Sequence, residues 1–509
     1  MTGRRSSVAD ILNVFKVKDE RTEKLVAYST IAALSAYMAA TSCLLFNWYD
    51  VHYFDQWYHQ YLKTGLLSVY SHCPKVHYPP LAVIFYIGLR LFTVNVFHAT
   101  SLWATVHVFK AVLVACYALL CLLIVREFRW PIAQWGVLSV PAGSVIWGVQ
   151  FDVIIALLTF VALERAWKGK PLSSGLALAA ASAFKFVPGV LLLPITAVMW
   201  AKHGKRSLVP LLTSFFGFTV IVWGPFFLYD PRAFLWQVFE FHMYRIPQDL
   251  TIFNLPIAIH RWKVTHMAFL LGKISGWVLI AGTLVFGLYP FFKKQKVERM
   301  IKDLGTKYTV IGLSAPLMLW FLLTTKVGNP YYITWAYLPV FPLACNVIHP
   351  LPVAMIDAAA FYYPTSLMPA AILGKKVFIA EDLKWENAVK LMRLSSLAKV
   401  SRHYLLTHPP SWYFVLAPVL ALLTGREISY HRFLDIWYQK MHLVVSFVII
   451  VYTFFVALAL YQVLSWLRDP SPVDERPHDW IVHPVLAVVT LPAFLFGLSL
   501  LLTAVSRLF

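Results

Sequence analysis

The sequence predicts an all-α polytopic membrane protein with about 12–14 transmembrane helices, because apolar segments of spanning length recur along the chain. Hydrophobic residues make up 59% of the 509 residues and charged residues 13%, whereas a soluble domain has about 25% charged residues. Backbone groups within lipid need partners inside the protein, and a helix supplies them along its own length. The predicted architecture is therefore a helical bundle.

Residues 1–27 are expected to form a cytoplasmic or interfacial segment before the first span. Ser7 is a suitable cap for a short helix whose apolar stripe contains Val8, Ile11 and Phe15. Such a helix would lie on the inner leaflet, although a frayed terminus explains the segment equally well. The polar start and the long first apolar span do not fit a cleaved secretory signal.

The spans are placed by continuous hydrophobicity, and Pro or Gly within a membrane helix is tolerated. Residues 28–349 are expected to form the transmembrane core, with large loops at 48–78 and 230–265 after the first and seventh spans. Residues 350–509 are expected to form an accessory C-terminal membrane module, in which 374–404 has the pattern of an amphipathic interfacial helix. The candidate spans are roughly 28–47, 79–97, 102–125, 131–148, 151–167, 172–200, 207–229, 266–292, 308–325, 331–349, 351–373, 405–424, 436–465 and 481–507.

Clusters of Lys and Arg predict the orientation, since short cytoplasmic loops are enriched in these residues. They lie at the N-terminus, near 202–206 and near 293–307, and all three fall on one side if the N-terminus is cytoplasmic. Both large polar loops then face the outside or the lumen of a plasma or endoplasmic reticulum membrane. Charged residues at 126–129 and 164–170 do not fit this arrangement, because the span count places them on the outer side.

The net charge of +20 would suggest a nucleic-acid partner in a soluble protein. Here the basic residues cluster in loops between apolar spans, where they meet anionic lipid. We therefore expect membrane lipids, and no nucleic acid, among the partners. The five cysteines show no CxxC or Cys/His metal spacing, so they define neither a metal site nor a redox compartment.

The loop after the first span is rich in aromatic and polar residues, in the run NWYDVHYFDQWYHQYLKTGLLSVYSHCPKVHYPPL. Asp50 follows the span directly, so its carboxylate would be partly desolvated at the membrane surface. Burial raises the pKa of a carboxyl group and can make it a general base; a helix cap or a solvated acid is the alternative. Asp55 lies in the same loop but on a different helical face, so no carboxylate pair is implied.

Short motifs recur in a fixed order between residues 28 and 349. They are D-V-H-Y at 50–53 with Trp57, Gly65 and Y-P-P-L at 78–81; W-G-V-Q-F-D at 147–152; Gly175 with K-F-V-P at 185–188; and K-V-G-N-P-Y-Y-I-T-W at 326–335. Together they resemble polyprenol-phosphate-sugar-dependent membrane glycosyltransferases of the GT-C fold, and are similar to the mannosyl- and glucosyltransferases of that superfamily. Val149 and His52 depart from the usual motifs, and residues 350–509 are not covered.

The resemblance implies a GT-C-like bundle of seven core spans with large external loops after spans one and seven. It also implies transfer of a hexose or pentose from a polyprenyl- or dolichyl-phosphate sugar, with inversion at the anomeric carbon. The acceptor would be a lipid-linked glycan, a lipid or a protein on the non-cytoplasmic face. The aspartate of the first loop, Asp50, would be the general base.

Further site residues follow from this reaction. The leaving polyprenyl phosphate needs positive charge, for which the candidates are Lys326, Arg245, His242 and Arg261. The aromatic candidates could instead belong to an interfacial aromatic belt. Asp152 could instead be a structural residue that bridges helices. The substrate-binding candidates are Asp55, His52, Tyr53, Trp57, Tyr78, Asp152, Lys185 and Tyr331.

No cofactor is predicted with certainty. The sequence has no D-x-D or paired acidic motif, so no metal ligand is assigned, although a divalent metal stays an open alternative. A polytopic transporter or lipid flippase is the competing function, since buried ionisable residues also mark transport paths. The inverted repeats typical of many transporters are not seen in the sequence, and a noncatalytic membrane scaffold is a third option.

Overall fold

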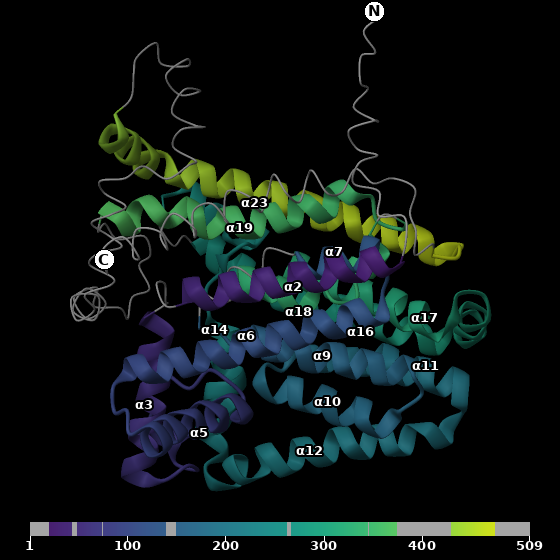
Figure 1. Cartoon of the computed structure of the whole chain (residues 1–509), viewed down its shortest axis with the longest axis horizontal. Coiled ribbons are helices and arrows are strands. Elements are labelled where there is room, and N and C mark those ends of the chain that lie inside the picture. The colour runs from purple at the N-terminus through teal and green to yellow at the C-terminus, as the bar shows by residue number, and fades with distance from the viewer. Residues whose placement is uncertain are drawn as a thin grey trace, which may run out of the picture.

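A computed structural model describes residues 20–42, 48–73, 75–138, 149–261, 266–344, 346–373 and 429–473. The described chain is a stack of long helices, most of which run in roughly the same direction (Figure 1). The main helices are α2 (Glu20–Ser42), α3 (Trp48–Thr64), α5 (Pro80–Phe97), α6 (Leu102–Glu127), α9 (Asp152–Trp167), α10 (Pro171–Phe184), α11 (Leu192–His203), α12 (Leu208–Tyr229), α16 (His266–Phe292), α17 (Lys294–Thr324), α19 (Pro350–Leu373) and α23 (Tyr430–Arg468).

Shorter elements connect these helices. Within the described residues they are α4 (Val69–His72), α7 (Trp130–Val137), α13 (Pro231–Leu235), α14 (Phe241–Tyr244), α15 (Leu255–Ile259), α18 (Ile333–Ala336) and the strands β1 (Gln248–Asp249) and β2 (Val327–Gly328). Six described helices are long and apolar enough to cross a membrane, which confirms an all-α polytopic membrane fold. They are Pro80–Phe97, Leu102–Glu127, Lys205–Tyr229, His266–Phe292, Lys294–Thr324 and Tyr438–Arg468.

The interior of the bundle forms where α9 and α10 pack between their neighbours. Most of α9 is buried, and α10 packs closely on α12. Gly175 permits this contact, because a Cβ atom at that position would lie 2.3 Å from the carbonyl oxygen of Leu211. Small residues commonly allow helix backbones to approach in this way in membranes. By contrast, α12 and α16 expose large apolar residues such as Ile221 and Trp277, as lipid-facing helices do.

The basic loops gather at one end of the bundle, which we call the basic end. Arg129 pairs with Glu23 at the start of α2, with 3.5 Å between Nε and Oε2. Lys307 Nζ donates to the carbonyl oxygen of Glu127 at 2.9 Å, and Lys296 Nζ donates to that of Arg468 at 3.0 Å. The start of α2 therefore lies beside the ends of α6 and α23 and the first part of α17.

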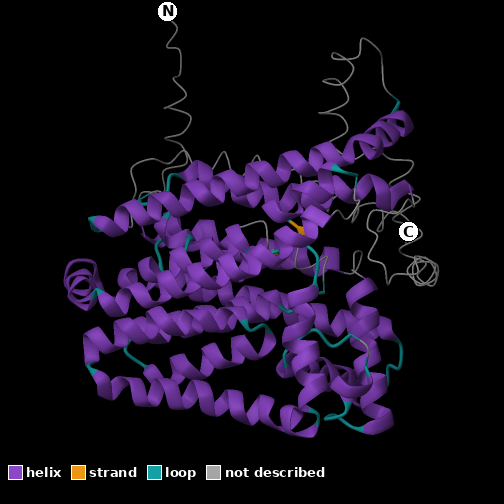
Figure 2. Ribbon diagram, turned by 180° about the vertical axis from the view of Figure 1, so that it is seen from behind, coloured by secondary structure: helices purple, strands orange, loops and turns teal. Residues whose placement is uncertain are grey.

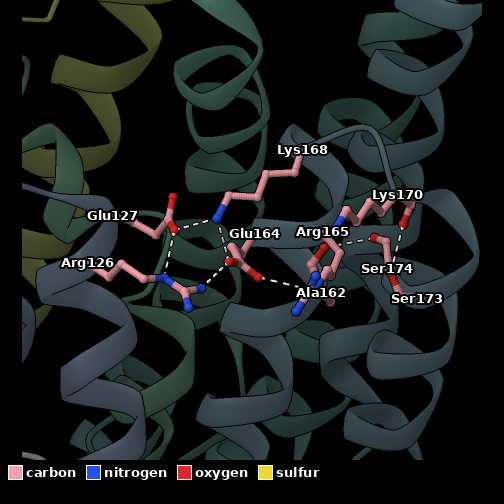
Figure 3. Close-up of polar contacts among 9 residues, drawn as sticks. All are labelled: Arg126, Glu127, Ala162, Glu164, Arg165, Lys168, Lys170, Ser173 and Ser174. Atoms are coloured by element: carbon pink, nitrogen blue, oxygen red, sulfur yellow. Dashed lines mark hydrogen bonds and ion pairs between the residues drawn. The ribbon is translucent and has the colours of Figure 1, made fainter.

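An ion-pair network also lies at the basic end, between α6 and α9 (Figure 3). The Glu164 carboxylate, 2% exposed, accepts from Arg126 Nη2 at 2.5 Å and Lys168 Nζ at 2.7 Å. Lys168 Nζ also reaches Glu127 at 2.5 Å. The span count placed these charges on the opposite side of the membrane from the basic loops, and that expectation is wrong. The reason lies in α5, whose two ends remain at the other end of the bundle.

The position of α5 follows from the contacts of Arg90, which lies in the second half of that helix. Arg90 Nε is 3.4 Å from Asp55 Oδ1 on α3. Its other nitrogens donate to the carbonyl oxygens of Thr100 at 2.7 Å and Ser101 at 2.9 Å. The start of α6 is thus held close to α3, and α3 and α5 lie together at the left of Figure 1. We call this the Asp50 end.

Two predicted spans are interrupted. The segment 172–200 divides into α10 and α11 at a 3-10 turn, Val187–Leu191, that contains Pro188. The segment 331–349 is buried but is not one helix, because 3-10 turns at Pro330–Tyr332 and Phe341–Leu343 flank the short α18. Proline lacks a backbone N–H and disrupts the helical bonding pattern.

The basic segment near 293–307 is helical rather than a loop. It forms the first part of α17, which bends at Gly305 with a φ of 76°. A positive φ is favourable only for glycine among ordinary residues. The amphipathic first part of α17 therefore turns into a buried helix without an intervening loop.

The two large polar loops of the sequence contain structure and contact each other. Residues 48–78 form α3 and α4, and the side chain of Gln237 fastens this region to the segment after α12. Gln237 Nε2 donates to the Cys73 carbonyl oxygen at 2.9 Å and its Oε1 accepts from the Val76 amide at 3.2 Å.

A short parallel β-pair joins residues that are far apart in sequence (orange in Figure 2). Gln248 is opposite Val327 and Asp249 is opposite Gly328. The Leu250 amide donates to the Gly328 carbonyl oxygen at 2.9 Å. Only glycine fits at 328, because a Cβ atom there would lie 1.9 Å from the carbonyl oxygen of Leu250.

Some predictions fall outside the described residues. They concern the helix capped by Ser7, the amphipathic segment 374–404 and the spans 405–424 and 481–507. Nothing in the structure tests the division into residues 1–27, 28–349 and 350–509.

Candidate functional site

Asp50 lies in the first turn of α3 and is partly exposed. Gln150, in the turn before α9, donates a side-chain hydrogen bond to Asp50 Oδ2. Tyr78 in turn donates from its hydroxyl to Gln150 Oε1 at 2.9 Å. The amide of Gln150 is thereby oriented with its N–H toward the carboxylate.

Burial raises the pKa of Asp50 from its ordinary value of 3.8 to about 6. The hydrogen bond from Gln150 and the positive charges of Lys185 and Arg245 oppose this rise, because they favour the carboxylate form. An acid with a pKa near 6 is ionised at neutral pH and still binds a proton readily. These are the properties of a general base.

A buried ion pair lies next to this carboxylate. Lys185 Nζ is 2.8 Å from both carboxylate oxygens of Asp152, which is fully buried at the start of α9. Trp335 Nε1 also donates to Asp152 Oδ1 at 2.8 Å. Lys185 Nζ further lies 4.7 Å from the ring centroid of Tyr332. Lys185 follows the last residue of α10, so the pair connects α9, α10 and the broken segment after α17.

Basic side chains from the segment after α14 and from the segment after α17 also belong to the site. Arg245 donates through Nε and Nη2 to Gln248 Oε1 at 2.9 and 2.6 Å. Burial and the charge of Arg245 lower the pKa of Lys326 to about 8, and Lys326 Nζ donates to the Met243 carbonyl oxygen at 2.7 Å. A lysine and an arginine placed so that the charge of one lowers the pKa of the other are suited to binding an anion, here Arg245 acting on Lys326.

Two histidines, His242 and His77, lie near Arg245 and respond to its charge. Burial, with the positive charge of Arg245, lowers the pKa of His242 to about 4. His77 stacks on Phe241 with ring centroids 3.3 Å apart, and burial lowers its pKa to about 3. Both imidazoles are therefore neutral at pH 7 and act there as hydrogen-bonding groups rather than as charges.

Tyr331 and Asp249 complete the group. Burial raises the pKa of Tyr331 and of Asp249. The negative charges of Asp50, Asp152 and Asp249 add to the rise in the pKa of Tyr331. The positive charge of Arg245 opposes the rise in the pKa of both Asp50 and Asp249.

The structure brings eight of the predicted site residues into this arrangement. They are Asp50, Tyr78, Asp152, Lys185, His242, Arg245, Lys326 and Tyr331.

The other predicted residues have different surroundings. Asp55 faces Arg90 and His59, with Oδ2 3.2 Å from His59 Nε2. Trp57 is buried beside Phe54, and Arg261 is an exposed turn residue whose charge acts on His442 of α23.

His52 and Tyr53 also make contacts within or near α3. His52 Nε2 is 3.0 Å from Gln56 Nε2, and Tyr53 accepts a hydrogen bond from Lys75 Nζ at 3.1 Å. These two residues belong to the α3 surface and the return segment after α4.

Sequence reasoning missed several members of the site. Gln150 and Trp335 stand inside motifs that were recognised, but no role was assigned to them. His77 directly precedes the Y-P-P-L motif but is not among the predicted site residues. Asp249 carries no signal in the sequence, because its place depends on the β-pair with Gly328.

The arrangement places a carboxyl group of raised pKa near the partly buried cations Arg245 and Lys326. Among the described residues no group of three or more His, Cys, Asp or Glu side chains is placed to hold a metal ion.

A comparison with protein families gives one match. Residues 77–305 match the model of glycosyltransferase family 87. This stretch includes Tyr78, Gln150, Asp152, Lys185 and Arg245. A search of curated proteins gave no match.

Proposed function

Because the chain is a membrane glycosyltransferase of the GT-C type, we propose that it uses a polyprenyl- or dolichyl-phosphate sugar as donor. The transferred sugar is a hexose or pentose, and the acceptor is a lipid-linked glycan, a lipid or a protein. The observation that supports this most is the position of Asp50, a carboxylate of raised pKa beside Lys185 and Arg245.

In this reaction Asp50 takes the proton from the acceptor hydroxyl as its oxygen bonds to the anomeric carbon. The bond between that carbon and the phosphate oxygen breaks on the opposite face, so the configuration inverts. The transition state resembles an oxocarbenium ion, by analogy with glycoside hydrolysis. Gln150 holds the carboxylate in place for this step.

The leaving group is a polyprenyl phosphate, which needs positive charge but no proton. Arg245 and Lys326 supply that charge, and the neutral imidazoles of His77 and His242 offer hydrogen bonds. Lys185 acts through Asp152 rather than directly on the phosphate, since both Asp152 oxygens accept from it. The isoprenoid chain of the donor lies along the lipid-facing helices.

The orientation is part of the proposal. The basic loops gather at the end opposite Asp50, and the positive-inside rule places such loops in the cytoplasm. The Asp50 end then faces the outside or the lumen, in a plasma or endoplasmic reticulum membrane. Lipid-linked sugar donors can be used on that face because the lipid carries them there.

The test is Asp50→Asn, assayed with defined polyprenyl-phosphate mannose, glucose, galactose and arabinose and with mass spectrometry of the products. We expect transfer to fall about 10²- to 10⁴-fold, the usual contribution of a general base. Asp230→Asn is the matched control, because Asp230 caps α13 by accepting from the Ala233 amide at 3.0 Å and an asparagine also caps a helix.

Normal transfer by the Asp50→Asn protein would remove Asp50 as base. Movement of a labelled lipid across vesicles by the wild-type protein, with no sugar transferred from any donor, would instead favour the flippase.

A further inference from the structure

Asp249 has an unusual backbone conformation beside the site. Its φ is 61°, in the left-handed region, which few residues other than glycine adopt and which asparagine and aspartate tolerate better than the rest. Such conformations persist where the surrounding structure holds them, and they cluster at functional sites. The conformation thus calls for an explanation in terms of what the side chain reaches.

The surroundings hold this residue on three sides. The β-pair with Gly328 positions its backbone. Its carbonyl oxygen accepts from Asn254 Nδ2 at 3.0 Å and from the Thr251 amide at 2.9 Å. On the side chain, Tyr363 of α19 donates to Oδ1 at 3.4 Å, a long hydrogen bond.

The carboxylate of Asp249 also lies in the electrostatic surroundings of the other site residues. Its charge acts on Tyr331 and Tyr332, the two tyrosines that follow Pro330 in the broken segment. Tyr331 also responds to Asp50, and Asp249 itself responds to Arg245. Asp249 is only partly buried by the protein. Asp249 follows Gln248, which accepts from Arg245, and it pairs with Gly328, two residues after Lys326. The residue therefore lies beside the proposed phosphate-binding group.

The donor sugar must occupy this region if the proposed function is right. Its anomeric carbon is bonded to the phosphate near Arg245 and is attacked by the hydroxyl that Asp50 deprotonates. The remaining hydroxyls of the ring then point to nearby acceptors. A carboxylate presents two oxygens that accept hydrogen bonds from neighbouring hydroxyls.

We propose that Asp249 binds a ring hydroxyl of the donor sugar and so helps to select which sugar is transferred. This assignment rests on the proposed function, because it takes the transferred group to be the sugar of a polyprenyl phosphate. The strained backbone then serves to aim the carboxylate. The role is recognition of the donor and takes no part in proton transfer.

Asp249→Asn tests the assignment with little risk to the fold, since asparagine adopts the left-handed conformation as readily as aspartate. The assay uses whichever of polyprenyl-phosphate mannose, glucose, galactose or arabinose the wild-type protein accepts. It also uses monodeoxy versions of that donor, each lacking one ring hydroxyl. Asp230→Asn is carried alongside as the neutral acidic control.

We expect kcat/KM of Asp249→Asn to fall about 10- to 100-fold with the parent donor, as for a hydrogen bond to a charged group. One deoxy donor should cost the wild-type protein a similar factor and cost the variant little further. Asp230→Asn should behave as wild type with all donors. The pH dependence of the variant should also keep the wild-type acidic limb, because Asp50 is untouched.

Three results would contradict the assignment. Equal activity of Asp249→Asn and wild type would do so, as would a loss that is the same for every deoxy donor, which is the mark of a structural role. Failure of the wild-type protein to use any polyprenyl donor would overturn the proposed function together with this assignment. The first two results leave the proposed function standing.

Discussion

If Asp50 is the general base, as proposed, its protonation state controls the reaction. Its pKa of about 6 lies above the ordinary carboxyl value, chiefly through burial. The base is active only without its proton. We expect kcat/KM to be constant above pH 7 and to fall tenfold per pH unit well below pH 6, in an assay over pH 4.5–8.5. A profile without an acidic limb would contradict Asp50 as the titrating base.

Gln150 tunes that acidic limb. Its hydrogen bond stabilises the carboxylate and so lowers the pKa of Asp50 against the effect of burial. Gln150→Met keeps the length of the side chain and removes the donor, so the pKa of Asp50 should rise. The measurement is the midpoint of the acidic limb in kcat/KM, which we expect to move to higher pH. A midpoint that stays in place or moves to lower pH would refute this role.

Residue roles were only partly predictable. Asp50 and Asp152 lie about a hundred positions apart, and the family resemblance identified both. Asp55 shared the same loop and the same chemistry but pairs with Arg90, a partner that periodicity alone does not reveal. Asp249 could not be predicted, because a left-handed backbone conformation at one residue leaves no periodic pattern.

At the scale of elements, α9 and α10 are joined by the pair of Asp152 and Lys185. Removing one partner leaves a buried charge without compensation. Asp152→Ala should lower the free energy of unfolding by about 3–5 kcal/mol, measured by thermal unfolding in a fixed detergent. The double variant Asp152→Leu with Lys185→Met should regain part of this stability, because it removes both charges. If the double variant is less stable than Asp152→Ala, the pair is not the reason for the loss.

The helix α5 meets the length and hydropathy of a membrane span, yet it lies with α3 at the Asp50 end (Figure 1), where the Arg90 contacts hold the turn after α5 close to Asp55. Thr100→Cys, on an otherwise cysteine-free chain, should react with an impermeant maleimide from the same side as Thr64→Cys. Lys205→Cys should react from the opposite side. Equal sidedness of Thr100→Cys and Lys205→Cys in sealed vesicles would show instead that α5 crosses.

Elements were predicted well where hydrophobicity was continuous, as in α6, α12 and α16. They were predicted less well where proline and polar residues interrupt a buried segment, as in 331–349. Hydropathy measures burial and does not distinguish a helix from buried 3-10 turns. It also does not distinguish a helix across the membrane from an apolar helix folded onto one end, which depends on contacts such as that of Arg90.

At the scale of the whole molecule, the two ends of the bundle carry different groups of charged residues. The helix α9 begins at Asp152 in the site and carries Glu164 of the ion-pair network twelve residues later, about 18 Å away at 1.5 Å per residue. The network packs charges at the basic end, while the anion-binding group and the base lie at the other. The bundle therefore separates the features that set its orientation from those that carry chemistry.

Glu164→Gln tests this separation. The carboxylate is 2% exposed, but its partners Arg126 and Lys168 are 55% and 37% exposed, so water screens them once the charge is removed. We expect a loss of about 1 kcal/mol in stability. The acidic limb of the activity profile should not move, and a shifted limb would mean that the ends are coupled.

The chain's overall organisation was the most predictable part. Composition and apolar runs identified the fold class, and the basic loops identified which segments share a side. The span count failed between residues 79 and 170, because it counted α5 as a crossing. The contacts of Arg90 on α5 do not support that crossing. One wrongly counted crossing assigns every later loop to the wrong side of the membrane, until a second miscounted span reverses the error.

Arg90 has a further consequence during synthesis of the chain. The insertion machinery meets α5 as an apolar segment before α6 exists, and it judges such a segment largely by its residues. A single arginine near the middle of a segment disfavours insertion by about 2.5–3.5 kcal/mol. The residue that later fastens α5 to Asp55 and to the start of α6 thus also lowers the tendency of the nascent helix to insert into the bilayer.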